Sequence, residues 1–197
     1  MRSRSFRDAG GDKPTVTNSA PDSSRRRVLG VIGPGEHATP RDVADAFEVA
    51  ALAARGGWVV LTGGRDLGVM DAASRGARSA DGIAVGVLPD SDTRGASRAV
   101  DIAIVTGLGE MRDQVVVLSS DAIVVCGMSA GTAAEAAFAI KAQKPIVFFR
   151  PEQHVRTFYE QLGGEGVRVA MTPEEVLQVL ATIVERTGSQ FQDRSSK

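Results

Sequence analysis

The stretch that decides the fold runs from residue 119 to residue 135 and reads SSDAIVVCGMSAGTAAE. Its apolar core, residues 122–126, is short, β-branched and bounded by polar residues, which is typical of a strand covered on both faces. Gly127 and Gly131 give the backbone the freedom that a tight turn needs, and the alanine-rich run after Thr132 predicts a helix. The stretch therefore predicts a buried strand, a glycine turn and a helix start in direct succession.

This succession makes the turn at residues 127–132 a candidate anion site. The first amides of a helix have no carbonyl partner, and the helix dipole favours a phosphate or a carboxylate beside them. The same residues also allow a purely structural interpretation. Thr132 and Glu135 have the spacing of a capping box, in which the Glu135 carboxylate would accept from the Thr132 amide. The stretch alone leaves both interpretations open.

Apolar runs alternate with helical patterns on both sides of this stretch. Strands are expected at residues 28–33, 58–62, 83–88, 102–105, 121–126 and 145–149, with a short one at 166–169. Helices are expected at residues 40–55, 69–80, 111–118, 132–143, 154–162 and 173–186. The alternation predicts an α/β fold, a Rossmann-like three-layer αβα sandwich with a mostly parallel sheet of six to seven strands.

Composition limits the domain organisation and the classes of function. Residues 1–27 contain almost no large apolar side chain and are expected to form a disordered tail, residues 28–187 a single nucleotide- or cofactor-binding domain, and residues 188–197 a flexible C-terminal tail. The net charge of -1 gives no reason to expect a nucleic acid partner. The single cysteine excludes a disulfide framework, and the two histidines have no cluster of metal ligands around them. No apolar run approaches the ~20 residues of a membrane span, so we expect a cytoplasmic protein.

Glycines gather where the expected strands end, which is the edge at which open parallel sheets bind ligands. Four glycine clusters at one edge predict a groove where backbone amides approach a ligand closely. Arg65 and Arg112 are the candidate cations for its phosphate, although the sequence equally allows an ion pair of Arg112 with Glu110, Asp113 or Glu135. The candidate phosphate- and ligand-binding residues are Gly33, Gly63, Gly64, Arg65, Gly68, Arg112, Gly127, Met128, Ser129, Ala130, Gly131 and Thr132.

Two common nucleotide-binding classes fit poorly. Residues 33–38 match the pattern G-x-G-x-x-A, but the helix is expected to begin only at Pro40, and the second strand ends in Thr62 rather than in an acid that would bind a ribose. This argues against a nicotinamide dehydrogenase. The P-loop pattern G-x-x-x-x-G-K-[ST] is absent from the sequence, which argues against a P-loop NTPase.

Several short motifs together resemble the family of so-called lysine decarboxylase-like proteins. That family includes the LONELY GUY phosphoribohydrolases, which release a base from nucleoside 5′-monophosphates, and the molybdenum cofactor carrier proteins. The motifs are Gly63-Gly64-x-x-x-Gly68-Val69-Met70-x-Ala72, Gly86-Val87-Leu88-Pro89, Arg112, Ser120-Asp121-Ala122 and Gly131-Thr132-x-x-Glu135. The resemblance implies a Rossmann-like fold, a phosphorylated heterocycle as ligand and a homo-oligomer, a dimer or a tetramer.

Departures from the phosphoribohydrolase pattern favour the carrier branch. That pattern reads P-G-G-x-G-T-x-x-E, whereas Gly127, Met128 and Ser129 stand here in place of the proline and the two glycines. Arg112 and Glu135 match the catalytic arginine and glutamate of the phosphoribohydrolases, so they are catalytic only if this chain is such an enzyme. We therefore expect a binding protein for a phosphorylated pterin or nucleotide, with molybdenum cofactor as a possible cargo. The alternatives are a phosphoribohydrolase and a ligand-sensing or scaffold protein whose tail recruits a partner.

Overall fold

The computed structural model describes residues 25–194, and beyond residue 183 it describes the backbone alone. The disordered tail expected at residues 1–27 lies outside this range as far as residue 24. Seven strands form one sheet in which every pair of neighbours is parallel. The strands are β1 Val28–Ile32, β2 Val59–Thr62, β3 Ala84–Leu88, β4 Ile102–Val105, β5 Ala122–Cys126, β6 Ile146–Phe149 and β7 Val167–Ala170.

Six α-helices and two short 3₁₀ turns connect these strands. They are α1 Pro40–Arg55, α2 Gly68–Ser79, η1 Gly109–Met111, α3 Arg112–Ser119, α4 Ala130–Lys141, α5 Gln153–Gly163, η2 Gly164–Gly166 and α6 Pro173–Arg194. The expected elements are all present, most of them displaced by one or two residues at their ends. The last helix, expected to end at residue 186, continues to Arg194, and the flexibility of residues 188–197 stays a prediction.

The strand order is β4-β3-β2-β1-β5-β6-β7. Strands β2, β3 and β4 therefore add one after another on one side of β1, and β5, β6 and β7 then add on the opposite side of β1. Such a reversal between β1 and β5 leaves a crevice outside the carboxyl ends of the two strands, where open α/β sheets bind ligands. The register places Ile32 of β1 beside Val125 of β5, so the loops that follow these strands start from neighbouring positions.

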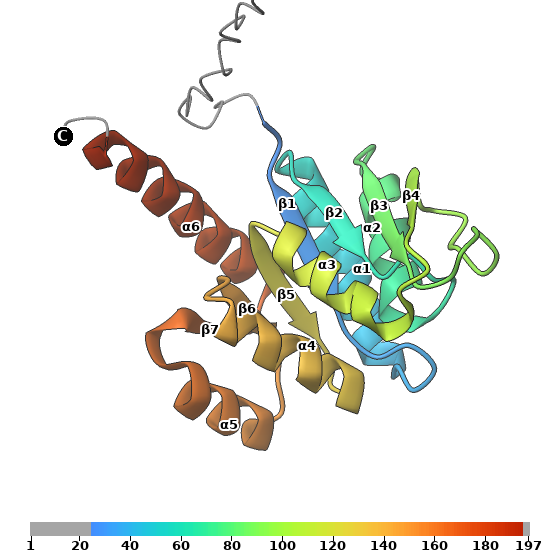
Figure 1. The fold of residues 1–197 in the computed structure, drawn as a ribbon. Coiled ribbons are helices and arrows are strands. Elements are labelled where there is room, and N and C mark those ends of the chain that lie inside the picture. The colour runs from blue at the N-terminus through green and yellow to red at the C-terminus, as the bar shows by residue number, and fades with distance from the viewer. Residues whose placement is uncertain (1–24, 195–197) are drawn as a thin grey trace, which may run out of the picture.

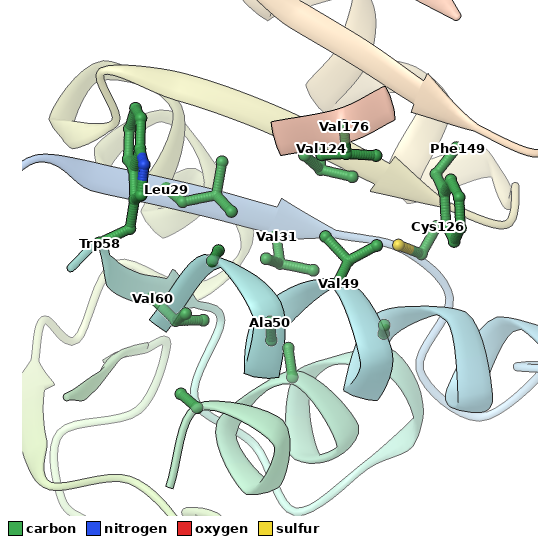
Figure 2. Close-up of a cluster of buried hydrophobic side chains, with 14 of the residues drawn as sticks. Leu29, Val31, Val49, Ala50, Trp58, Val60, Val124, Cys126, Phe149 and Val176 are labelled. Atoms are coloured by element: carbon green, nitrogen blue, oxygen red, sulfur yellow. The ribbon is translucent and has the colours of Figure 1, made fainter. Parts of the chain in front are cut away.

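Helices cover both faces of the sheet, as Figure 1 shows with α3 and α4 in front of it and α1 and α2 behind. Alternate residues of a strand point to opposite faces. In β5, Val124 and Cys126 pack with α1, α2 and α6, whereas Ile123 and Val125 pack with α3, α4 and α5. Figure 2 shows part of the first of these two cores. All five residues of β5 are buried, which confirms the strand covered on both faces.

Helix α1 begins with a capping box, because the Thr39 side chain accepts from the amide of Asp42 and the Asp42 carboxylate accepts from the amide of Thr39. Within the described residues, no helix combines the length and the apolar character that crossing a bilayer requires. These features together define a Rossmann-like αβα sandwich, as predicted.

Candidate ligand-binding site

A cleft of about 870 Å³ opens at the carboxyl edge of the sheet, on the side covered by α3 and α4. A narrow recess of about 150 Å³ continues it toward the end of β1. Arg112, Asp113, Gly131 and Glu135 line both spaces, so cleft and recess form one site. Its position is the crevice between β1 and β5 that the strand order creates.

One wall of the cleft is the first part of α4. Ser129 is the N-cap of this helix, and its side chain accepts a hydrogen bond of 3.2 Å from the amide of Thr132. The two amides between them, those of Ala130 and Gly131, have no carbonyl partner within the helix because they belong to its first turn. Both residues line the cleft, so these amides are available to an anion.

The expected capping box of Thr132 and Glu135 is not formed. The helix begins two residues earlier than expected, so Thr132 is the third helical residue and receives the cap of Ser129 instead of providing one. The Glu135 carboxyl therefore takes no part in capping the start of α4. It stands one turn after Gly131 on the same face of α4 and faces the cleft.

Arg112 is the cation at the centre of the site. It is the first residue of α3, and its side chain is only 13% exposed. One terminal guanidinium nitrogen lies 3.4 Å from the carbonyl oxygen of Val87, at the end of β3. The guanidinium fits there because Gly63 has no side chain: a Cβ atom at Gly63 would collide with it. Gly63 thus serves the site by making room for Arg112.

Carboxyl groups next to Arg112 give the recess its unusual electrostatics. Burial, and to a smaller extent the negative charge of Asp113, raise the pKa of Glu135 to about 8 against the opposing effect of Arg112. Burial also raises the pKa of Asp113, which Arg112 lowers in part. At neutral pH the Glu135 side chain is therefore mostly a neutral carboxylic acid, which both donates and accepts hydrogen bonds.

The contact between Arg112 and Asp113 is an ion pair of poor geometry. Nε of Arg112 lies 2.8 Å from Oδ1 of Asp113, but the N–H does not point at the oxygen. Both atoms are buried, and neither makes a hydrogen bond within the part of the chain that the structure describes. Buried polar atoms without hydrogen bonds are rare in proteins, so these two atoms keep hydrogen-bonding capacity that the described residues do not use.

Most of the predicted site residues come together here. The residues that line the cleft or its recess are Gly33, Gly63, Arg65, Arg112, Ser129, Ala130, Gly131, Thr132 and Glu135. The side chain of Arg65, however, is already paired with Asp90 at 2.7 Å. Any use of Arg65 by a ligand therefore competes with this ion pair.

Four of the predicted residues lie elsewhere. Gly64 packs against the Cα atom of Gly86, and Gly68 lies against the backbone carbonyls of residues 34 and 35, so both are required for close approach of the backbone. Gly127 and Met128 line a separate pocket between the first turns of α1 and α5. A Cβ atom at Gly127 would collide with the Asp42 carboxylate, so close packing also explains why a glycine stands at this position.

Sequence reasoning missed several lining residues: Asp90, Met111, Gln114 and Phe138. Two of these residues, Asp90 and Phe138, have sequence positions from which their place in the cleft could have been predicted. Asp90 closely follows a strand, as the predicted glycines do, and Phe138 lies on the same face of α4 as Gly131 and Glu135. Cys126, by contrast, is fully buried and belongs to the core, where burial raises the pKa of its thiol.

The fold and this cleft define a Rossmann-like αβα protein with a cleft at the reversal of its strand order. More specifically, the chain belongs to the SLOG cluster4 family, which matches residues 26–177. An uncharacterized protein of Archaeoglobus fulgidus is 36% identical over 149 residues, which are 76% of this chain and 91% of that protein.

Two solved structures are similar to this chain over most of its length. The molybdenum cofactor binding protein from Rippkaea orientalis is 44% identical with a TM-score of 0.80, and the match covers 82% of this chain and 99% of that one. The molybdenum cofactor carrier protein of Chlamydomonas reinhardtii is 40% identical with a TM-score of 0.77 over the same shares. The resemblance inferred from the motifs is thereby confirmed.

Proposed function

We propose that this protein binds a phosphorylated heterocycle in the cleft and carries it without converting it, with molybdenum cofactor as the cargo. The observation that carries the proposal is the similarity to two proteins described as binding or carrying that cofactor, at 44% and 40% identity over 99% of their chains. The proposal thus combines the function described for these relatives with the cleft of this chain, which we expect to hold the phosphorylated ligand.

The charges of the cleft support a phosphate at the start of α4. The amides of Ala130 and Gly131 supply donors, the helix dipole adds partial positive charge, and Arg112 brings a full charge that is largely shielded from water. Hydrogen bonds to a charged group in such a place are about twice as strong as those between neutral groups. The cleft, at about 870 Å³, accommodates both the phosphate and a ring system beside it.

Phosphoribohydrolase activity is the second candidate, because Arg112 and Glu135 line the same recess. The electrostatics argue against it. Cleavage of the glycosidic bond develops positive charge on the sugar, which an ionised carboxylate stabilises. Since the pKa of Glu135 is raised to about 8, this side chain is mostly neutral at pH 7 and provides little of that stabilisation.

Native mass spectrometry after incubation with molybdenum cofactor tests the proposal. We expect a complex that retains the intact cofactor, and a much weaker complex for Arg112→Ala. In parallel, incubation with nucleoside 5′-monophosphates should release no base. Base release that disappears in a folded Glu135→Gln variant would overturn the carrier function and establish the hydrolase.

A further inference from the structure

Arg65 and Asp90 form an ion pair in the wall of the cleft. Arg65 follows β2 and Asp90 follows β3, and a terminal nitrogen of the Arg65 guanidinium lies 2.7 Å from a carboxylate oxygen of Asp90. Both residues line the cleft, and their side chains are 41% and 46% exposed. Within the described residues, the Arg65 side chain makes no other hydrogen bond. A single exposed contact therefore holds this cation beside the space that a ligand would fill.

The backbone around both residues is fixed by other segments. Arg65 forms an antiparallel bridge with Ala96, in the loop that joins β3 to β4. The carbonyl of Asp90 accepts a hydrogen bond of 3.0 Å from the amide of Gly107. The ion pair therefore opens by rotation of the two side chains, and the loops that carry them stay in place.

The pair of Asp45 and Arg150 shows how differently a permanent ion pair is built in this protein. The Asp45 side chain is only 7% exposed, and Arg150 also donates to the carbonyl of Met171 and lies 4.5 Å from the centre of the Phe149 ring. An exposed ion pair contributes little to stability, because water screens its charges and both side chains lose rotational freedom. Separating Arg65 from Asp90 is therefore a small loss to the protein.

The two cations of the cleft differ in what they offer to a ligand. Arg112 is 13% exposed and lies against the carbonyl of Val87, so its charge has a fixed place deep in the site. The charge of Arg65 is neutralised by Asp90 until a stronger anion competes for it. A carboxylate carries a single negative charge, whereas a terminal phosphoryl group carries about two. A phosphoryl group is therefore the kind of anion that displaces Asp90.

We propose that Arg65 is a second phosphoryl-binding group, which Asp90 occupies until a diphosphate enters, so that the cleft prefers a heterocycle with a diphosphate to the same heterocycle with one phosphate. The first phosphoryl group binds Arg112 and the amides of α4. The second binds Arg65, whose planar guanidinium donates two parallel hydrogen bonds to phosphate oxygens, and Asp90 turns to solvent. This inference rests on the proposed function and adds to it the number of phosphoryl groups that the cleft takes.

Two pterins that differ in one phosphoryl group test the inference on the full-length protein. Calorimetry at one ionic strength would compare the monophosphate and the diphosphate of 6-(hydroxymethyl)pterin. We expect the diphosphate to bind at least roughly tenfold more tightly, the lower end of the range for hydrogen bonds to a charged group. Arg65→Ala should bring the ratio of the two affinities close to one and leave the affinity for the monophosphate nearly unchanged. Circular dichroism verifies the fold of each variant.

Asp90→Asn distinguishes a competitor of the ligand from a structural partner of Arg65. If Asp90 competes with the second phosphoryl group, this substitution frees Arg65 and raises the affinity for the diphosphate severalfold, whereas Arg65→Ala lowers it. A purely structural ion pair would give both substitutions the same sign, because each breaks the same contact.

The ion pair of Arg94 and Asp92 is the matched control. It also has a length of 2.7 Å and belongs to the same loop, but neither residue lines the cleft. Arg94→Ala and Asp92→Asn make the same changes of charge and should leave both affinities at the wild-type values.

Equal affinity of the wild-type protein for the two pterins, or a weaker diphosphate complex in both Arg65→Ala and Asp90→Asn, would overturn the inference. If neither pterin binds, the inference also fails. The proposed function is decided separately, by the mass measurement with molybdenum cofactor. A retained cofactor together with equal affinities for the two pterins would therefore overturn the inference alone.

Discussion

The guanidinium of Arg112 fills the space that a side chain at Gly63 would need. A Cβ atom at Gly63, just beyond β2, would collide with the guanidinium of Arg112, which begins α3. Gly63 does not have a positive φ, so its backbone conformation alone would admit another residue. The glycine is therefore required by the Arg112 guanidinium, with the Met70 sulfur beside it, and not by the turn, and this makes Gly63 and Arg112 a test of the site.

Gly63→Ala should weaken the binding of a phosphorylated ligand because the methyl group displaces Arg112. Arg112→Ala should cost on the order of 1.5–3 kcal/mol of binding free energy, the range for hydrogen bonds to charged groups. The double variant should bind about as weakly as Arg112→Ala alone, since both changes remove the same interaction. Calorimetry of the three variants measures this cycle.

Gly166→Ala is the control for the cycle, because a Cβ atom there meets nothing within 4 Å and the residue lies outside the cleft. It should leave the affinity at the wild-type value. Additive losses for Gly63→Ala and Arg112→Ala would show that the glycine acts on the ligand independently of the arginine.

Ser129→Ala should destabilise the fold by about 1 kcal/mol, because it removes the N-cap of α4. Glu135→Gln should have no such effect, since Glu135 takes no part in the cap. Chemical denaturation of both variants at pH 5 compares the two residues, at a pH where Glu135 is protonated in the folded protein. If Glu135→Gln were instead less stable than Ser129→Ala, the helix would be capped by Thr132 and Glu135, which would contradict the prediction.

The stability of the protein should depend on pH through Glu135. Its pKa is raised from 4.5 to about 8 in the folded protein, so between these values the folded state keeps a proton that the unfolded state has released. The stabilisation by this proton is complete below pH 4.5 and is lost as the pH rises toward 8, with a slope of at most about 1.4 kcal/mol per pH unit. Glu135→Gln should remove this slope.

Denaturation curves from pH 5 to pH 9 measure the difference between the two proteins. Glu174→Gln, a change at an exposed glutamate of α6, serves as the control and should follow the wild-type curve. Parallel curves for Glu135→Gln and the wild-type protein would show that Glu135 titrates in its ordinary range.

We expect a homo-oligomer, because the edge strand β4 leaves apolar side chains uncovered. Ile102 and Ile104 point to the same side of this strand and are 52% and 43% exposed. On α3, Val116 and Val117 are buried, whereas Leu118 is largely exposed. An exposed apolar edge of this kind favours association.

Ile104→Lys should therefore lower the molar mass measured by light scattering at micromolar concentration. Leu162→Lys, a change at an equally exposed apolar residue of α5, should leave the mass unchanged. A wild-type protein that is monomeric under these conditions would contradict the prediction.

The sequence by itself determined the elements and their parallel arrangement. Residues 122–126, with their β-branched side chains, specify a strand buried on both faces, and Thr39 with Pro40 specifies the start of α1, because both signals depend on neighbours a few residues away. The concentration of glycines at the strand ends also located the edge of the sheet that holds the cleft.

Only the tertiary structure decided which side chains share a site. Met128 and Ser129 are adjacent in one turn, yet Met128 lines the pocket beside α1 and α5 while Ser129 lines the recess beside Arg112. Glu135 has the spacing of a capping residue, but the helix starts earlier and the carboxyl is left to the cleft. Gly63 and Arg112 are far apart in the chain, and the close approach of their two segments, not any local pattern, makes the glycine necessary. Spacing along the chain reports contacts within one element, whereas the direction of a side chain at a strand end depends on the packing of all elements that meet there.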